Sequence, residues 1–255
     1  MPTSFEDMLY HVEHALSLYA YSFVLLPAHQ LYETDVLSEH QKTIDNCHIY
    51  LIGFTPKIKM EDVREEDGKL VISCSILGTT YDVEDLLPSG MVLRQEEEYF
   101  FVEDEGGNRY FPSAETIAVA LQQKTGVIDF KVIYIGQAYG SDGSRNAFDR
   151  LKKHETLQKI ALKGIPEGYE ISLCLLEIQP ANKIATVFNP MAQDDEDSND
   201  RIKAGLDKLF NTDEKERVTL YEASLIRYFE PEFNKEFKNS FPSTNMKVLK
   251  DLASP

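Results

Sequence analysis

Between His48 and Phe111, short runs of β-branched and aromatic residues alternate with clusters of turn-forming residues. The runs are HIYLIGF, KLVISCSIL, EYFFVE and NRYF, and the clusters are EEDGK, LLPSG and EDEGG. Because Val, Ile, Phe and Tyr favour strands while Gly, Pro, Asp and Asn favour turns, this pattern predicts a small, mostly antiparallel sheet. In residues 4–30, apolar residues recur at helical spacing, which predicts one or two helices before that sheet.

Further along, helical and strand patterns alternate. The sequence predicts a helix at residues 113–123, a buried strand at 127–135, a helix at 146–162, a strand at 169–178 and two helices at 200–210 and 219–229. Gly126 suits the end of the first of these helices, and we place a domain boundary there. The expected fold class is α+β, with a separate acidic α+β domain at residues 1–126 followed by a small central sheet flanked by helices at residues 127–255.

The charge of the chain is unevenly distributed. The net charge is −17, and residues 1–126 hold 8 Lys and Arg against 22 Asp and Glu, whereas residues 127–255 hold 18 against 21. A basic stretch at residues 145–163 has six basic residues and two acidic ones, while five acids cluster between Asp194 and Asp200. Phosphate binding requires clustered cations, so nucleic acid is expected to bind the second half and a protein partner the acidic first half.

Several classes of protein are disfavoured by the composition. The three cysteines lack the spacing of a disulfide framework or a zinc site, and no apolar stretch approaches the roughly 18 residues of a membrane span. We therefore expect a cytoplasmic protein without membrane contacts. The sequence contains no GxxxxGKS, GxGxxG or GxSxG motif. A metal cluster is not expected at the scattered residues His11, His14, Asp45 and His48.

Four features of the second half form one ordered pattern. The predicted strand ends in Tyr134-Ile135-Gly136, the next predicted helix carries Arg150 and His154, a later helix carries Glu222, and Asn234 follows twelve residues on. In this order the features resemble the GIY-YIG nuclease superfamily over residues 131–238. The resemblance implies a small sheet flanked by helices that cuts phosphodiester bonds of nucleic acid with one bound metal ion.

Three of these residues have side chains suited to phosphodiester hydrolysis. Arg150 and His154, at positions i and i+4 of one predicted helix, would point into one cleft. A guanidinium can hold two phosphate oxygens and stabilise the charge added in the transition state, while an imidazole can position or activate water. Glu222 offers the hard oxygen ligand that Mg²⁺, or Mn²⁺, prefers.

The remaining expected site residues have supporting roles. The resemblance implies that Tyr134 lines the cleft near the attacking water and that Asn234 fixes the segment after the glutamate helix by side-chain hydrogen bonds. Glycine at position 136 would let the backbone turn tightly. The expected substrate contacts are Gly136, Arg145, Lys152 and Lys153.

A second tyrosine of the family pattern is not found directly upstream, where the sequence reads VIDFKV. Tyr110 could fill the role if residues 113–124 are an insertion between two strands, and Tyr99 is a weaker candidate. Arg145 competes with Arg150 as the catalytic arginine, but only Arg150 stands four residues before His154.

The function that follows from the resemblance is a metal-dependent endonuclease, with DNA favoured as substrate. Residues 1–126 would dock the nuclease onto a protein partner, or the acidic residues would cover the basic helix until displaced. The alternatives are a catalytically idle binding or scaffold protein that keeps the fold, and a purely structural ion pair between Glu222 and Arg150.

Overall fold

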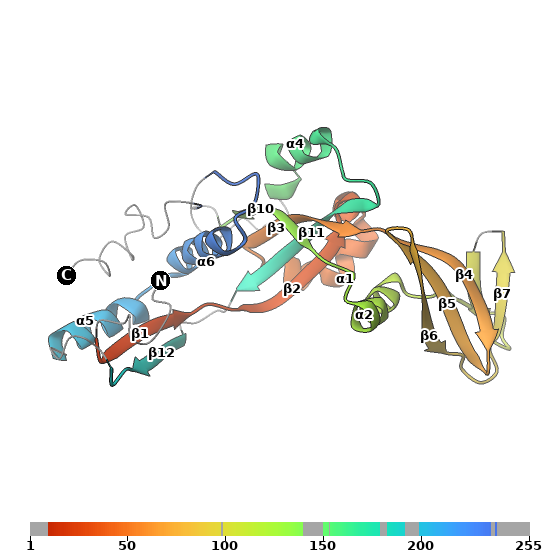
Figure 1. Ribbon diagram of the computed structural model, residues 1–255, viewed down its shortest axis with the longest axis horizontal. Helices are drawn as coiled ribbons and strands as arrows, with labels where there is room; N and C mark the ends of the chain where they lie inside the picture. Colours follow the sequence, from red (N-terminus) through yellow and green to blue (C-terminus); the bar gives the residue numbers. More distant parts are fainter. Residues whose placement is uncertain are drawn as a thin grey trace. The chain divides into compact units, whose positions relative to one another are not determined.

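The computed structural model describes residues 10–97, 99–139, 150–152, 154–178, 183–191, 199–235 and 238. Its elements mix strands and helices, which confirms the α+β class (Figure 1). In chain order they are β1 (Val12–Ser17), β2 (Ala20–Pro27), the 3-10 helix η2 (Ala28–Tyr32), α1 (Thr34–Ile44), β3 (Ile49–Pro56), β4 (Ile58–Glu66), β5 (Lys69–Ile76), β6 (Thr79–Leu86), β7 (Val92–Glu96), β8 (Tyr99–Glu103), β9 (Arg109–Tyr110), α2 (Ala114–Thr125), β10 (Lys131–Gln137), α4 (Glu155–Lys163), β11 (Tyr169–Ile178), β12 (Lys183–Phe188), α5 (Asn199–Phe210) and α6 (Glu214–Phe229). None of the described helices is both long enough and apolar enough to span a membrane.

The chain divides into two compact units, and the division differs from the boundary expected near Gly126. Unit 1 comprises residues 1–52, 132–159 and 173–255, and unit 2 comprises residues 53–131 and 160–172. The reason for the difference is strand pairing: β2 and β3 share a four-stranded sheet with β10 and β11, in the order β10-β3-β11-β2. Unit 2 is therefore largely an insertion between two neighbouring strands of this sheet.

The central sheet is buried most deeply at β3, where all eight residues are buried. Burial of every position means that both faces of this strand are covered, which explains its continuous apolar run. Helix α1 lies against β2, and α6 buries a continuous apolar side that includes Val218, Leu220, Ala223 and Ile226. This sheet and α6 hold the expected site residues.

The helices predicted at residues 4–30 are wrong for most of the described part of that range, which forms β1 and β2 and only then the start of η2. In β2 the exposure alternates, because Tyr21, Phe23 and Leu25 are exposed while Val24 and Leu26 are buried. The register of β1 with β12 runs from Val12↔Phe188 to Ser17↔Lys183. The apolar residues of this stretch fit both helical and strand spacing. Pairing with strands distant in sequence therefore determines that the stretch forms strands.

Unit 2 contains two small antiparallel sheets where the turn pattern predicts one, and the first predicted run, HIYLIGF, instead forms β3 of the central sheet. Strands β4, β5 and β6 form one three-stranded sheet, and β7, β8 and β9 form another. Helix α2 begins at Ser113, whose side chain accepts a hydrogen bond from the Thr116 N–H, and ends at left-handed Gly126. The helix predicted at residues 113–123 is thus confirmed, and Ile117 and Leu121 join the hydrophobic core of β4, β5 and β6.

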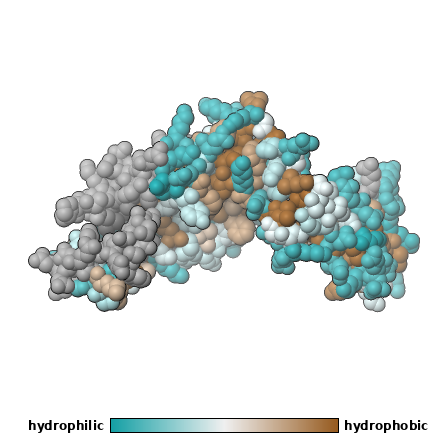
Figure 2. Space-filling view, in the orientation of Figure 1, coloured by the Kyte–Doolittle hydropathy of each residue, from teal (hydrophilic) through white to brown (hydrophobic). Residues whose placement is uncertain are grey.

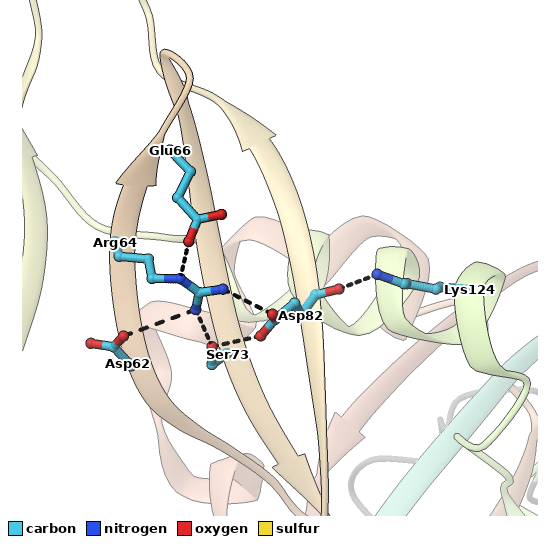
Figure 3. Close-up of polar contacts among 6 residues, drawn as sticks. All are labelled: Asp62, Arg64, Glu66, Ser73, Asp82 and Lys124. Atoms are coloured by element: carbon cyan, nitrogen blue, oxygen red, sulfur yellow. Dashed lines mark hydrogen bonds and ion pairs between the residues drawn. The ribbon is translucent and has the colours of Figure 1, made fainter.

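A polar network joins the three strands of the β4-β5-β6 sheet to α2 (Figure 3). Arg64 on β4 donates to Glu66, Ser73 and Asp82 at 2.6, 2.6 and 2.9 Å, and Lys124 on α2 donates to the main-chain oxygen of Asp82. The charged side chains of Arg64, Glu66 and Asp82 are 36–56% exposed, so solvent screens their ion pairs and the apolar core supplies most of the stability. These contacts give Arg64, Asp82 and Lys124 a structural role.

Unit 2 is acidic, with 9 Lys and Arg against 18 Asp and Glu in residues 53–131 and 160–172. Figure 2 shows hydrophilic residues over much of its visible strands and hydrophobic residues gathered over the central strands of unit 1. The acidity assigned to the first half of the chain therefore lies mainly in the inserted unit.

In the second half, the strand predicted at residues 169–178 is confirmed as β11, and the predicted pair of helices corresponds to α5 and α6. Helix α6 begins five residues earlier than expected, because Asp213 and Glu216 form a capping box. Strand β10 begins at Lys131 rather than at residue 127. The acidic run around Asp194 lies outside the described residues.

Candidate active site

Tyr50, on the buried strand β3, is the centre of a cluster of polar and aromatic side chains in unit 1. Its side chain is fully buried. Strand β3 lies next to β10 in the central sheet, and the main chain of His48 accepts a hydrogen bond from the N–H of Ala138 at 2.8 Å. These contacts bring the strand of Tyr50 beside the strand of Tyr134.

The hydroxyl group of Tyr50 contacts two of the expected site residues. Its oxygen lies 2.9 Å from His154 Nε2, and Arg150 Nε donates to it at 3.2 Å. The Tyr134 ring completes the group, with its centroid 6.1 Å from that of Tyr50 and 5.1 Å from that of His154. Side chains from three separate parts of the sequence therefore converge on one hydroxyl.

Arg150 and His154 do not lie in one continuous helix, so that part of the prediction is wrong. Lys152 forms a turn, and His154 precedes α4, with its N–H donating to Leu151 and its carbonyl accepting from Gln158. His154 is buried and bonded to Tyr50, and these contacts fix it at the start of α4 rather than inside a longer helix. The two side chains meet through Tyr50, not through helical spacing.

Burial and neighbouring charges alter the acid–base properties of this cluster. Burial, together with the proximity of Tyr134, raises the pKa of Tyr50, and the Arg150 hydrogen bond opposes that rise. Burial, then the positive charge of Arg150, lowers the pKa of His154. At neutral pH the phenol is therefore protonated and the imidazole is neutral.

Glu222 lies on α6, half-buried, and its charge acts on Arg150. Partial burial lowers the pKa of Arg150, but the hydrogen bond to Tyr50 and electrostatic interactions with Tyr50, Tyr134 and, least of all, Glu222 outweigh burial and raise it. Arg150 thus stays cationic between a phenol and a carboxylate. This electrostatic link joins the glutamate helix to the tyrosine cluster.

Gly136 is required by close packing and not by a tight turn. Its φ is outside the left-handed region, which corrects the expectation of a special backbone conformation. A Cβ atom at this position would lie 2.5 Å from the Tyr50 hydroxyl oxygen and 3.0 Å from Tyr134 Cε1. Glycine therefore lets the ring of Tyr50 lie directly against β10.

Asn234 bonds to the outer edge of β10. Its Nδ2 donates to the Ile135 carbonyl at 2.8 Å, and its Oδ1 accepts from the Ile135 N–H at 2.9 Å. Next to it, the Phe233 N–H donates to the Ile133 carbonyl at 3.1 Å. These three bonds tie the segment after α6 to the strand that carries Tyr134.

The other expected residues lie apart from the cluster or outside the described residues. Tyr110 is in β9 of unit 2, where its hydroxyl group donates to Asp104 at 3.3 Å, and Tyr99 is exposed in the adjacent strand β8. Both therefore belong to a different compact unit from Tyr50. Lys152 is exposed, and its carbonyl accepts a hydrogen bond from Tyr32 at 3.3 Å. Arg145 and Lys153 lie outside the described residues.

A metal ion at this site would depend on Glu222. Within the part of the chain that the structure describes, no group of three or more His, Cys, Asp and Glu side chains could hold a metal ion. Mg²⁺ fits such a donor set, because it retains several water ligands and commonly binds through one or two carboxylates and substrate phosphate. The scattered residues His14, Asp45 and His48 contact Thr186, Gln41 and Tyr139 respectively.

Tyr50 is the candidate site residue that the sequence pattern did not identify. A signal was present: IYLIG at residues 49–53 resembles IYIG at residues 133–136, and both are apolar runs that suit buried strands. The family pattern places its second tyrosine close to the YIG strand, whereas Tyr50 lies 84 residues before Tyr134. Unit 2 separates the two runs, so their proximity becomes evident only from the sheet order.

The comparisons with known proteins leave the chain without an assigned family. No protein-family model matches it, and neither a curated protein nor a solved structure shows a significant match.

Proposed function

We propose that this chain is a metal-dependent endonuclease with a GIY-YIG-like site that hydrolyses phosphodiester bonds of nucleic acid, with DNA favoured. The observation that carries the proposal is the Tyr50 hydroxyl, which lies within hydrogen-bond distance of both Arg150 Nε and His154 Nε2. Tyr50 supplies the second tyrosine of the pattern, in place of Tyr110.

If the cluster served only to pack the core, it would lower the stability of the folded protein. His154 is 8% exposed, and its Nδ1 has no hydrogen-bond partner among the described residues. A buried polar atom left without a partner costs about 1–3 kcal/mol, and an apolar side chain would fill the same space without that cost. Ionisable groups with shifted pKa values that gather around one hydroxyl are typical of catalytic sites.

The geometry supports a route for the proton of an attacking water. Neutral His154 can accept the Tyr50 proton at Nε2 while the Tyr50 oxygen takes a proton from the water. Before substrate binds, Arg150 donates a hydrogen bond to the same oxygen. In this step the water oxygen forms a bond to phosphorus, the bond to the leaving oxygen breaks, and a proton ends on His154.

Substrate binding would have to uncover Tyr50. Its side chain is fully buried, whereas Arg150 is exposed. A phosphate group offers Arg150 a stronger, charge-assisted partner than a neutral phenol. Arg150 would therefore turn to the phosphate, expose the Tyr50 hydroxyl and stabilise the added charge of the transition state.

Glu222 would hold the metal ion. Its half-buried position on α6 and its electrostatic effect on Arg150 support this role. When bound, Mg²⁺ or Mn²⁺ supplies charge neutralisation at the phosphate and at the leaving oxygen. Asn234 supports the arrangement, because it ties the segment after this helix to the strand of Tyr134.

The test is a cleavage assay on plasmid, linear double-stranded and single-stranded DNA, and on RNA, with Mg²⁺ or Mn²⁺. We expect metal-dependent cleavage by the wild type and its loss in Glu222→Ala, while Glu167→Ala, which changes an exposed glutamate of unit 2, retains activity. If the folded wild-type protein leaves every substrate intact with both metals, the nuclease proposal fails and the idle scaffold is favoured.

A further inference from the structure

The two edges of the central sheet differ. At the β10 edge, Asn234 and Phe233 occupy the outward main-chain groups of Ile135 and Ile133. At the other edge, β2 has no strand beyond it within the described residues. An edge strand left open in this way is a template for pairing with another chain unless charges, proline or a bulge block it.

Strand β2 has few of these protective features. Its sequence, AYSFVLLP, contains no charged residue, and its proline is the last residue. Exposed large side chains alternate along it: Tyr21 is 68% exposed, Phe23 64% and Leu25 52%. The opposite face of the strand is covered, because Val24 and Leu26 are buried and α1 lies against it. The result is an apolar stripe beside an open edge.

The chemistry of the stripe selects its partner. Nucleic acid and anionic membranes bind through cations, and β2 has none. A second copy of the same strand matches it without any charge, because a two-fold antiparallel pair centred on Phe23 places Tyr21 opposite Leu25 of the other copy. In that register all three exposed side chains lie on one face and contact their counterparts across the pair.

We propose that two copies of this chain associate by antiparallel pairing of β2 with β2, with Phe23 opposite Phe23, so that the two central sheets become continuous. The inference is independent of the proposed nuclease activity, because it concerns only the β2 edge and the stripe.

The expected association is weak and strengthened by salt. The three side chains expose on the order of 300 Å² on each copy. Even with main-chain pairing added, the contact is at the small end of specific interfaces, so dissociation in the micromolar range is expected. Each copy carries a net charge of −17, and salt screens the repulsion between them.

The first test is sedimentation equilibrium of the full chain at about 5–200 μM in low and high salt. We expect a concentration-dependent dimer for the wild type and a monomer for Phe23→Lys. The control is Leu162→Lys, which changes an exposed leucine, 87% exposed in unit 2, and should dimerise as the wild type does. A wild-type chain that stays monomeric throughout this range overturns the proposal.

Cysteine substitution tests the register. Under mild oxidation Phe23→Cys should form a covalent dimer, because residues opposite each other in an antiparallel pair have Cα atoms about 4.5–5.5 Å apart. Tyr21→Cys alone should not, since its two copies would lie about 13 Å apart along the strands. Mixing Tyr21→Cys with Leu25→Cys should restore the cross-link. Equal cross-linking by all three single variants would contradict the proposed pairing.

Discussion

Tyr50 and Tyr134 are 84 positions apart in the sequence, yet their ring centroids lie 6.1 Å apart. The hydroxyl oxygen of Tyr50 contacts both Arg150 Nε and His154 Nε2. At the scale of single residues, the proposed chemistry therefore depends on one oxygen atom.

Removing that oxygen should abolish most of the activity without unfolding the protein. In Tyr50→Phe the ring remains to fill the buried space while the proton acceptor is lost, so we expect kcat/KM to fall by about 10²–10⁴-fold. Single-turnover cleavage with circular dichroism as a folding check measures this. Tyr110→Phe, in β9 of unit 2, is the matched control and should cleave normally; equal losses in both variants would refute the role of Tyr50.

The depressed pKa of His154 predicts how stability depends on pH. Because the folded state holds His154 neutral below its unfolded pKa of about 6.5, its contribution is complete above that pH and is lost as pH falls through the folded pKa. Urea unfolding of wild type and His154→Gln at several pH values tests this. The stability difference between the two proteins should be largest above pH 6.5 and shrink in acid; a difference that stays constant would contradict the shift.

The same group predicts the pH profile of cleavage. His154 must be neutral to accept a proton, so kcat/KM should stay level above its folded pKa and fall as the pH drops through it. The acid limb should therefore lie below pH 6.5. A limb that lies above that value would assign the proton acceptor to another group.

At the scale of elements, β3 and β10 can approach closely only because residue 136 is glycine. In Gly136→Ala the new Cβ would lie 2.5 Å from the Tyr50 hydroxyl oxygen and force the ring aside. We expect a loss of stability of about 1–3 kcal/mol together with a large loss of cleavage.

Gly205→Ala is the matched control for that substitution. Gly205 lies in α5 with nothing within 4 Å of an added Cβ, so alanine should raise stability slightly through its better helix propensity. Thermal unfolding of both variants, with the cleavage assay, measures the contrast. If Gly136→Ala were as stable and active as Gly205→Ala, the packing argument would be wrong.

Elements with strong local signals could be predicted from the sequence. Helix α2 has a serine cap, a glycine end and helical periodicity, while the strands of unit 2 alternate with turn residues. Strand β2 could not be predicted, because its apolar residues satisfy both helical and strand spacing and its pairing with β11 is non-local.

The candidate site residues could likewise be predicted only where the signal is local in sequence. Arg150, His154, Glu222 and Asn234 could be selected from their order, because they belong to one stretch of sequence. Tyr50 could not be selected by its spacing from Tyr134, since residues 53–131 of unit 2 lie between them in the sequence. The break between Arg150 and α4 was also missed, because the buried contact of His154 with Tyr50 has no local signature.

At the scale of the whole molecule, salt distinguishes ordinary substrate binding from self-masking by the acidic residues. If Arg145, Arg150, Lys152 and Lys153 contact phosphates, log(kcat/KM) should fall linearly with log[salt], with a slope of about −3 to −4. If acidic residues cover the basic segment, activity should first rise as salt screens that contact. Cleavage rates measured between about 20 and 300 mM KCl separate the two; a rise followed by a fall would favour masking.

The insertion of unit 2 between β3 and β10 also bears on how the chain reaches its native state. The two strands are neighbours in the sheet but are separated by 74 residues. If those residues were a disordered loop, closing the loop would cost conformational entropy and would slow the pairing of β3 with β10. Most of them instead have a hydrophobic core of their own, in β4, β5, β6 and α2. If that core forms first, the remaining chain between β3 and β10 becomes short. Assembly of the cluster around Tyr50 would then wait on the folding of a segment that contributes no residue to it.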